Sequence, residues 1–496
     1  MAFDYDMLIV GGGINGTAIA RDAAGRGLKV LLCERDDLAS HTSSSSTKLI
    51  HGGLRYLEYY EFKLVREALI EREVLLGSAP HIIWPMRFVL PYDEGLRPAW
   101  MLRLGLFLYD SLGGRKKLPG TRTLDLRKPP HSGVLEGRLT KGFEYSDCWV
   151  EDARLVVLNA IDARALTADI RTRTEVVSLS SIEGGYEAEI RCGRKLERVT
   201  ARCVVNSAGP WVDQVLGKIK RDTNEQSLRL VKGSHIVLPK LYEGDHAYIF
   251  QNKDNRIIFA IPYERNKTLI GTTDVPYSHT EGPVKISPEE IEYLCSAANE
   301  YFEHDISPSD VAWTYSGVRP LYDDRSENAS AVTRDYVLDI EELSDGAPLL
   351  SIYGGKITTS RKLAEHAMEK LEPFFDDLGK RWTESNPLPG GDMKDRDYDR
   401  FRDGCLQKWP HLPASLVRRL CRAYGTRIEL VLEGCETLED MGENFGQDLT
   451  EAEIKYLQLH EWVTTADDVL WRRTKLGVHM SEPEIKRLNT WFETHA

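Results

Sequence analysis

The stretch YDMLIVGGGINGTAIARDAAGRGLKVLLCERDD, residues 5–37, indicates the fold class of the N-terminal domain. The apolar run 5–10 predicts a short strand, and three glycines follow it in the pattern G-x-G-x-x-G. Small apolar residues at 18–24 then predict a helix that packs closely on a sheet, and LKVLLCE predicts a second strand that ends at Glu34. The order strand, glycine turn, helix, strand indicates the beginning of an α/β domain.

Each residue of this pattern has a physical role in dinucleotide binding. Gly11 permits a tight turn, Gly13 lets the backbone approach a pyrophosphate, and Gly16 lets the helix lie against the strand. The helix N-terminus offers free N–H groups and a partial positive charge to the phosphates. Glu34 follows at about 20 residues, where it can accept a hydrogen bond from a ribose hydroxyl. We therefore prefer dinucleotide binding to a glycine turn in an unrelated α/β fold.

The residues that follow favour FAD over NAD. Residues 36–53, DDLASHTSSSSTKLIHGG, have no strand pattern, whereas a simple NAD domain continues with regular βαβ units. Small hydroxyl side chains can donate many hydrogen bonds to a long cofactor without steric bulk. A solvated serine linker is the alternative, but the run is short and an apparent helix, 54–76, begins directly after it.

Two later segments repeat the strand, turn and helix order. They are ARCVVNSAGPWVDQV, residues 201–215, and PLLSIYGGKITTSRKLAEHAMEKL, residues 348–371. A helix N-terminus that points at a flavin ring would stabilise the negative charge of the reduced flavin. Ordinary strand-to-helix connections have the same sequence pattern and are the alternative. A second G-x-G-x-x-G is absent from the sequence, so we expect electrons to leave the flavin for a quinone or oxygen.

Composition limits the class of protein. The chain has 496 residues, which predicts two or three domains. A formal net charge of −13, with no long basic stripe, argues against nucleic acid as a partner. The eight cysteines form no C-x-x-C pair, which indicates a reducing compartment and neither a zinc site nor a redox dithiol. No apolar run approaches the ~18–20 residues of a membrane span, and the N-terminus lacks the basic region of a signal peptide, so we expect a cytoplasmic protein.

Several cations occur in settings that suit a phosphate pocket. Arg319 stands between a glycine and a proline, Arg334 begins a strand-like run, and Lys356 lies in the last glycine turn. His51 and Arg55 are four residues apart, so a helical turn would place them on one side. Arginine binds phosphate through two parallel hydrogen bonds, while a structural ion pair is the alternative for each single arginine.

The motifs together resemble those of the aerobic, FAD-dependent glycerol-3-phosphate dehydrogenase family over nearly the full length. They are IVGGGINGTAIARDAAGRGL, SSTKLIHGGLRYLE, REALIEREVLL, KGFEYSDCWVEDARLV, KGSHIVLP, IGTTD, WTYSGVRPL, YGGKITTSRKLAEHA and EWVTTADDVLWRRTKLG. The resemblance implies oxidation of sn-glycerol 3-phosphate to dihydroxyacetone phosphate by hydride transfer to FAD, with ubiquinone as the next electron acceptor. It also implies a homodimer, peripheral on the cytoplasmic face of the inner membrane.

The resemblance further implies an α/β, Rossmann-like FAD-binding domain interleaved with a β-sheet substrate domain, followed by an α-helical C-terminal domain. Within residues 1–388 we expect the FAD-binding domain at 1–60, 200–215 and 345–370, and the substrate domain at about 75–110 and 225–345. The segment ESNPLPGGD marks a boundary, so the helical domain is expected at 392–496. The stretch IIFAIPYERNKTLIGTTD predicts a hairpin.

The candidate site residues follow from the motifs and from the resemblance. His235 is the first choice for the base that takes the substrate hydroxyl proton, with Lys356 and His51 as alternatives. The substrate-binding candidates are Arg55, Tyr56, Arg319, Arg334, Thr272 and Asp274. The cofactor-binding candidates are Gly11, Gly12, Gly13, Asn15, Gly16, Glu34, Arg35, Thr42, Ser43, Ser46, Thr47, Lys48, Leu49, His51, Gly53, Ala208, Gly209, Trp211, Gly354, Gly355, Lys356 and Thr358.

No metal site is expected. The run DMKDRDYDRFRDGC, residues 392–405, alternates acids as a calcium loop does, but Arg400 occupies the position at which such a loop requires glycine. We interpret the run as a solvated helix start.

The stretch RPAWMLRLGLFLYDSLGGRKK, residues 97–117, is a candidate for membrane contact. Its apolar residues can share one face of a helix, and five basic residues, Arg97, Arg103, Arg115, Lys116 and Lys117, lie around it. A buried helix with a basic tail is the alternative.

Three other functions remain open at the level of sequence. They are a glycerol-3-phosphate oxidase that passes electrons to oxygen, a non-catalytic flavin-binding redox sensor, and an NAD-linked glycerol-phosphate dehydrogenase. The membrane candidate argues against the first, the grouped cations and histidine against the second, and the serine-rich segment against the third.

Overall fold

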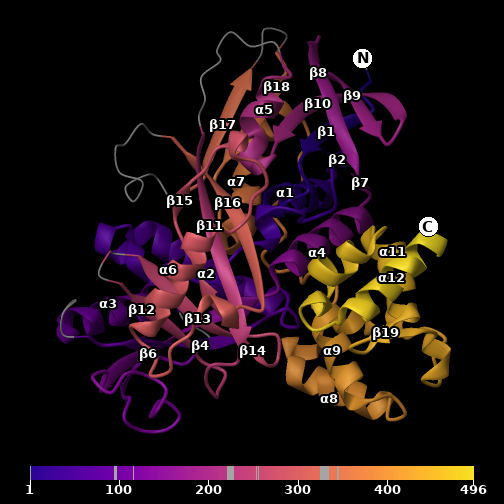
Figure 1. Cartoon of the computed structure of the whole chain (residues 1–496). Coiled ribbons are helices and arrows are strands. Elements are labelled where there is room, and N and C mark those ends of the chain that lie inside the picture. The colour runs from indigo at the N-terminus through magenta and orange to yellow at the C-terminus, as the bar shows by residue number, and fades with distance from the viewer. Residues whose placement is uncertain are drawn as a thin grey trace.

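The computed structural model describes residues 2–93, 98–114, 117–219, 228–252, 254, 256–323, 335–342 and 346–495. Two large sheets form the body of the molecule, and a mainly helical unit formed by the C-terminal residues lies beside them (Figure 1). None of the helices in the described ranges combines the length and the apolar character that a membrane span requires.

The first sheet has eight strands, of which six follow the order β17-β18-β10-β1-β2-β7, while β8 and β9 extend from β10. Strand β1 is parallel to β2 and β10, and β10 is parallel to β18. Helices α1, α4 and α7 bury their apolar residues in one common core with this sheet. The elements are β1 (Tyr5–Val10), α1 (Ile14–Gly25), β2 (Val30–Cys33), α4 (Asp152–Ala165), β7 (Asp169–Arg171), β8 (Thr174–Ile182), β9 (Gly185–Cys192), β10 (Lys195–Asn206), α5 (Val212–Leu216), β17 (Val337–Glu342), β18 (Pro348–Tyr353) and α7 (Ser360–Leu371).

The second sheet has ten strands and is mostly antiparallel. Helices α2 and α3 contribute to the core on one side, and α6 contributes to the core on the other. The predicted hairpin is confirmed, because β13 pairs with β14 in antiparallel register. The elements are β3 (Leu49–Ile50), α2 (Phe62–Ser78), β4 (Ile83–Pro91), α3 (Ala99–Leu112), β5 (Arg122–Asp125), β6 (Lys141–Val150), β11 (Leu228–Pro239), β12 (Ala247–Gln251), β13 (Ile257–Tyr263), β14 (Lys267–Gly271), β15 (Val275–Pro276), α6 (Pro288–Asn299) and β16 (Trp313–Tyr322).

The two sheets exchange segments along the chain. Strand β3 lies within the N-terminal residues expected in the first domain, yet it pairs with β6 of the second sheet. Strand β17 lies within the stretch expected in the substrate domain, yet it pairs with β18 of the first sheet. The chain therefore crosses between the sheets several times, as an interleaved arrangement requires.

The predicted helix over 54–76 is interrupted. Residues Leu54–Tyr59 form a 3₁₀-helix, η2, and Tyr60 then adopts φ 60° before α2 begins. The predicted helical turn that contains His51 and Arg55 is wrong, because Gly53 adopts a left-handed conformation at φ 75°. The backbone turns sharply at Gly53 rather than continuing in a helix.

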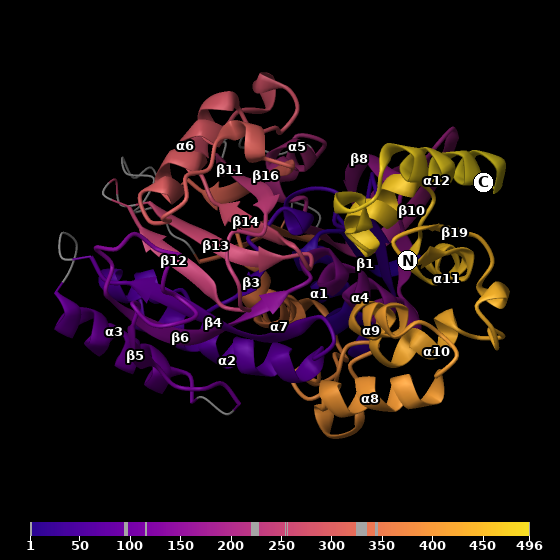
Figure 2. The ribbon, with the colours of Figure 1, turned by 60° about the horizontal axis from the view of Figure 1, so that its bottom comes forward.

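The C-terminal unit has its own hydrophobic core. It contacts α4 of the first domain, as the orange and yellow elements of Figure 2 show. Buried ion pairs join the two units, Arg154 with Glu461 and Arg473 with Asp37. The elements are α8 (Tyr398–Lys408), α9 (Ala414–Tyr424), α10 (Ile428–Val431), β19 (Asn444–Gly446), β20 (Leu449–Thr450), α11 (Glu451–Glu461), a π-helical turn η11 (Asp468–Arg473) and α12 (Glu482–His495).

The acidic run at 392–405 begins α8. Asp397 is the N-cap of this helix, and its side chain accepts a hydrogen bond of 3.1 Å from the Arg400 N–H. The carboxylate therefore has the helix-capping role that a solvated helix start predicts.

Candidate functional site

The serine-rich segment 42–53 is packed against β16 of the second sheet and against the N-terminus of α1. The Thr42 hydroxyl donates to the Val318 carbonyl at 2.7 Å. A Cβ added to Gly317 would lie 2.9 Å from the Ser45 Cβ, so only glycine lets β16 come this close to the segment. These contacts exclude a free solvated linker.

A buried ion pair fixes the middle of the segment. The ammonium of Lys48 lies 2.9 and 2.8 Å from the two oxygens of Asp152 and donates to the Ser44 carbonyl at 3.0 Å. The Ser46 hydroxyl also donates to Asp152, at 2.9 Å. Lys48 is fully buried in this pair, so its contribution to a cofactor site is to shape the loop around Ser44–Ser46.

The N-terminal glycine turn has the geometry that the sequence predicts. Gly11 adopts φ 109°, and a Cβ added to Gly16 would overlap the Gly11 carbonyl, so helix and strand meet at closest approach. The Ser43 hydroxyl accepts a hydrogen bond of 3.0 Å from the Ile14 N–H, and the position of a Cβ on Gly13 lies 3.1 Å from that hydroxyl. The serine-rich segment therefore reaches the N-terminus of α1, and helix N-termini are suited to bind phosphate groups.

Glu34 closes the same turn. One carboxylate oxygen accepts from the Gly12 N–H at 2.7 Å, and the other accepts from the Asp36 N–H at 2.8 Å. Each oxygen keeps a further lone pair that a ribose hydroxyl could reach, so the predicted role of Glu34 is compatible with its position.

The two other predicted cofactor segments approach this turn. The Asn15 side-chain amide donates to the Gly354 carbonyl at 3.1 Å, and a Cβ on Gly355 would lie 3.0 Å from that amide nitrogen. After β10, Gly209 adopts φ 55° and open space surrounds its Cβ position. The ring of Trp211, two residues further on, lies 4.3 Å from the Arg35 guanidinium. Three glycine-containing connections, after β1, β10 and β18, thus lie at the C-terminal ends of these parallel strands. Ala208 directly precedes Gly209 in the connection after β10.

Arg319 is held at the edge of the second sheet. It pairs with Asp274 and donates to the Thr272 hydroxyl at 3.0 Å. A Cβ on Gly233 would lie 2.6 Å from its guanidinium, so this glycine makes room for the arginine. About a third of the Arg319 side chain stays exposed, which leaves donors for an anionic group.

A second cluster surrounds His51. The His51 N–H donates to the Thr358 hydroxyl at 3.2 Å, and the Lys356 ammonium lies 4.0 Å from the centre of the Tyr56 ring. Gly53 lets that ring lie directly against the backbone. Burial, followed by the charges of Lys356 and Arg72, lowers the pKa of His51 to about 4, so its imidazole is neutral at physiological pH.

His235 lies deeper in the molecule. Its Nε2 is 3.0 Å from the Thr47 hydroxyl, and its ring stacks on Tyr315 at 4.6 Å. Burial, followed by the charges of Arg319 and Lys48, lowers the pKa of His235 well below its ordinary value. Only 2% of His235 is exposed, whereas His51 is half-buried, so His51 is the more accessible of the two histidines.

The assignments of Arg55 and Arg334 to substrate binding stay predictions. Within the described part of the chain, Arg55 has no hydrogen-bond or ion-pair partner, and it lies in η2 beyond the turn at Gly53. Arg334 lies outside the described residues.

Several structural partners of the site were not singled out from the sequence. Asp152, Tyr315 and Tyr109 reach it from elements far away along the chain, through Lys48, His235 and Gly52 respectively. For Asp152 the sequence offers one signal, the acid-rich motif EYSDCWVED that ends at this residue.

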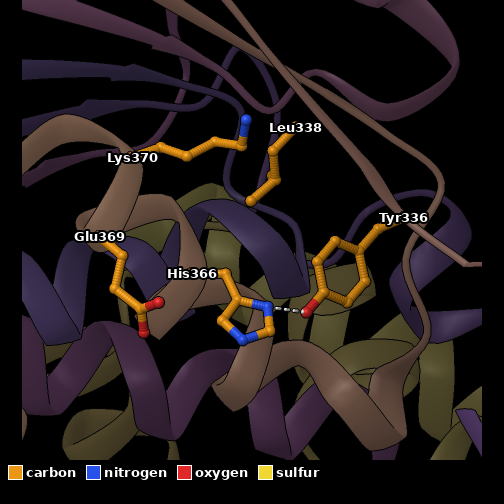
Figure 3. A pocket seen from close by; sticks show the side chains of 5 residues that line it. All are labelled: Tyr336, Leu338, His366, Glu369 and Lys370. Carbon is orange, nitrogen blue, oxygen red and sulfur yellow. Dashed lines mark hydrogen bonds between the residues drawn. The ribbon is translucent and has the colours of Figure 1, made fainter. Parts of the chain in front are cut away.

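A cavity of about 340 Å³ lies elsewhere, between β17 and α7 (Figure 3). Its lining includes Tyr336, whose hydroxyl is hydrogen-bonded to Nδ1 of His366, together with Leu338, Glu369 and Lys370. None of the predicted site residues lines it, so we do not assign the chemistry to it.

Comparison with known proteins agrees with this geometry. Residues 6–360 match the family described as FAD dependent oxidoreductase, and residues 381–490 match the C-terminal domain of alpha-glycerophosphate oxidase. The D-erythritol 1-phosphate dehydrogenase of Brucella abortus (strain 2308) is 54% identical over 490 residues, covering 98% of this chain and 97% of that protein. The aerobic glycerol-3-phosphate dehydrogenase of Escherichia coli (strain K12) is 50% identical, also over 490 residues and with the same coverage.

A solved structure shares the whole fold. The X-ray structure of the glycerol-3-phosphate dehydrogenase from Bacillus halodurans, complexed with FAD, is 28% identical and aligns with a TM-score of 0.75. The alignment covers 99% of this chain and 94% of that one. The arrangement of a cofactor domain, a sheet domain and a C-terminal unit is therefore common to both chains.

Proposed function

Because the chain belongs to the FAD dependent oxidoreductase family, we propose that it oxidises sn-glycerol 3-phosphate to dihydroxyacetone phosphate. Bound FAD supplies the hydride acceptor for this reaction. The observation that carries the proposal is the grouping of a neutral histidine, His51, with Lys356 beside the glycine turns, in a chain whose full-length relatives are named for polyol phosphates.

The residues of the first sheet fit FAD. A Cβ on Gly12 would lie 2.8 Å from the Glu34 side chain, and one on Gly13 would lie 3.1 Å from the Ser43 hydroxyl, so the turn is closely packed at the N-terminus of α1, where a pyrophosphate would bind. Glu34, which accepts from the Gly12 N–H, could also accept from a ribose hydroxyl, and the loops at Gly209 and Gly354 follow neighbouring strands of the same sheet. These residues would hold the cofactor.

Different residues of the chain bind the substrate phosphate and accept the substrate proton. In this proposal Arg319 and Lys356 hold the phosphate. Arg319 keeps about a third of its side chain exposed beside Asp274, and Lys356 lies beside the Tyr56 ring. His51 accepts the proton of the hydroxyl on the carbon that is oxidised, and the C–O bond of that carbon becomes a carbonyl. We prefer His51 to His235 as the base because His235 is sealed between Tyr315 and Thr47.

A four-carbon polyol phosphate is the second candidate substrate. The observation in its favour is the 54% identity to a D-erythritol 1-phosphate dehydrogenase, compared with 50% to the glycerol-3-phosphate dehydrogenases of Escherichia coli and Pseudomonas aeruginosa. The two substrates share a phosphate and a secondary hydroxyl and differ by one CHOH unit. The same phosphate and proton contacts serve both, so discrimination depends on the space beyond the reacting carbon.

Ubiquinone as electron acceptor and a peripheral site on the cytoplasmic face of the inner membrane are part of this proposal. Helix α3 supports the membrane contact, because Trp100 and Phe107 are both 65% exposed on its outer face. Tyr60, 80% exposed at the end of the adjacent η2, extends the apolar surface. Arg103 and Lys117 are exposed near it, while Arg97, Arg115 and Lys116 lie outside the described residues. Assembly as a homodimer is proposed from the family resemblance alone.

Steady-state kinetics with the two phosphates tests the substrate. The purified protein is assayed with sn-glycerol 3-phosphate and with D-erythritol 1-phosphate, using a soluble quinone analogue as acceptor. A higher kcat/KM for glycerol 3-phosphate supports the first candidate, and a higher value for the four-carbon phosphate supports the second. Equal turnover with oxygen alone would instead identify an oxidase.

A further inference from the structure

Two consecutive backbone N–H groups, those of His51 and Gly52, are hydrogen-bonded to side chains from other elements. The His51 N–H donates to the Thr358 hydroxyl at 3.2 Å, and the Gly52 N–H donates to the Tyr109 hydroxyl at 2.7 Å. Thr358 precedes α7, and Tyr109 belongs to α3. The main chain that carries His51 is therefore held from two directions.

The Tyr109 hydroxyl is itself oriented by a buried carboxylate. It lies 2.8 Å from each oxygen of Asp147, and Asp147 accepts from the Arg72 guanidinium at 2.7 Å. Because the hydroxyl gives its only proton to Asp147, it can only accept from Gly52. All three side chains are at most 4% exposed. The hydrogen bond to Gly52 thus has a defined direction that solvent does not compete with.

Gly52 is required for this approach. A Cβ there would lie 2.8 Å from the Tyr109 hydroxyl and would overlap the Leu69 side chain. A larger residue would push the backbone away from Tyr109 and move the neighbouring imidazole with it.

We propose that Tyr109, Asp147 and Arg72 form a positioning network that fixes the Gly52 peptide and so aims the His51 imidazole at the substrate hydroxyl. The inference rests on the proposed function, in which His51 accepts the hydroxyl proton. The phosphate contacts come from Arg319 and Lys356, which the network does not touch through any hydrogen bond of the described residues. Loss of the network therefore slows proton transfer without weakening substrate binding.

The variant Tyr109→Phe removes the hydroxyl and keeps the ring. Tyr145→Phe is the matched control, because Tyr145 is buried beside Tyr109 at a ring separation of 5.7 Å but is not a hydrogen-bond partner of Gly52. Both proteins are measured for FAD content, for the dissociation constant of sn-glycerol 3-phosphate by flavin absorbance, and for the rate of flavin reduction in one anaerobic turnover.

We expect Tyr109→Phe to slow reduction by about 10- to 100-fold, the cost of displacing a reacting group by up to about 1 Å, with FAD content and dissociation constant unchanged. The control should reduce at the wild-type rate. A wild-type rate in Tyr109→Phe, or equal slowing in both variants, would overturn the network. If wild-type protein is not reduced by the substrate, the proposed function fails and the network fails with it.

A second variant covers the case in which Tyr109→Phe does not fold. Asp147→Asn keeps the shape of the side chain but removes the charge that orients Tyr109 and Arg72. It should also slow reduction at an unchanged dissociation constant. An unchanged reduction rate in folded, FAD-loaded Asp147→Asn would contradict the proposal.

Discussion

Single glycines show where functional side chains come close to the backbone. Gly233 makes room for Arg319, and Gly271 makes room for the His235 ring. The sequence shows a glycine one or two residues before His235, Arg319 and Lys356. It does not show which side chain fills the space, because the partner comes from another strand. Arg319 of β16, for example, pairs in register with Val231 of β11, and its guanidinium lies over Gly233 on that strand.

The same limit applies to the choice of base. KGSHIVLP and IHGG each offered one histidine, and nothing local distinguishes them. The difference arises from packing, since His235 stacks on Tyr315 from β16 while His51 keeps partial exposure beside Lys356. Accessibility is a property of the folded chain, and it cannot be obtained from residue type or spacing.

Replacing Arg319 with alanine tests the phosphate contact at the residue scale. We expect the KM for sn-glycerol 3-phosphate to rise, with a loss in kcat/KM of at least about 1.5–3 kcal/mol, the value of a charge-assisted hydrogen bond. Activity with glycerol, which lacks the phosphate, should change far less. Arg198→Ala, which removes an exposed arginine from β10, is the control. Unchanged affinity in Arg319→Ala would assign the phosphate to other residues.

At the scale of elements, strong periodic patterns predicted the structure and weak ones did not. The run from β1 to β2 has the predicted order because glycine spacing and apolar periodicity agree. The helix expected at 54–76 breaks at Tyr60, whose left-handed conformation no residue type there signals. The short strand β3 depends on pairing with β6, nearly one hundred residues further along the chain.

A side chain in the N-terminal turn should abolish cofactor retention. In Gly13→Val the added atoms would lie against the Ser43 hydroxyl and fill the space of the pyrophosphate. Gly404→Ala is the control, because its Cβ position in α8 is open. FAD released by denaturation is quantified for each purified protein. A normal FAD content in Gly13→Val would show that the pyrophosphate lies elsewhere.

Helix α3 gives a prediction of its own about membrane contact. Replacing both Trp100 and Phe107 with glutamate should release the protein from anionic vesicles, because it removes two exposed apolar side chains and adds repulsion of about 1 kcal/mol for each charge. The matched control replaces Leu196 and Leu459, which are 56% and 72% exposed on other elements. Vesicle co-sedimentation measures the bound fraction. Equal binding of the two double variants would remove α3 from the interface.

At the scale of the whole molecule, the order of the domains could be predicted, but the contacts between the domains could not. Composition and the resemblance led to a cofactor domain, a sheet domain and a helical end, and the fold agrees. The contacts that unite them are buried ion pairs such as Arg154 with Glu461 and Arg473 with Asp37. Each pair joins residues more than three hundred positions apart, so local sequence carries no signal for it.

Buried histidines predict how stability of the molecule depends on pH. The pKa of His81 is lowered to about 3 and that of His246 to about 4, and burial is the largest cause in both. In the unfolded chain a histidine titrates at about 6.5, so below that pH the unfolded chain binds more protons than the folded one. The free energy of unfolding therefore falls as pH drops from 6.5, by up to about 1.4 kcal/mol per pH unit for each such histidine.

Chemical denaturation at neutral and at mildly acid pH measures this effect. His81→Leu should reduce the loss of stability on acidification, since neither ring nitrogen of His81 has a hydrogen-bond partner in the described structure. His304→Leu, at an exposed position, is the control and should leave the loss unchanged. An equal loss of stability in His81→Leu and the wild type over this pH interval would show that His81 does not gain a proton when the chain unfolds.

Anaerobic reduction of the bound flavin measures whether this chain oxidises a polyol phosphate. The purified, FAD-loaded protein is mixed without oxygen with sn-glycerol 3-phosphate, and the yellow absorbance of the oxidised flavin is followed. We expect rapid bleaching in one turnover, with dihydroxyacetone phosphate formed in equal amount to the flavin reduced, and far slower bleaching with glycerol. A flavin that stays oxidised with saturating glycerol 3-phosphate, and equally with the four-carbon phosphate, would contradict the assignment of this chain as a polyol-phosphate dehydrogenase.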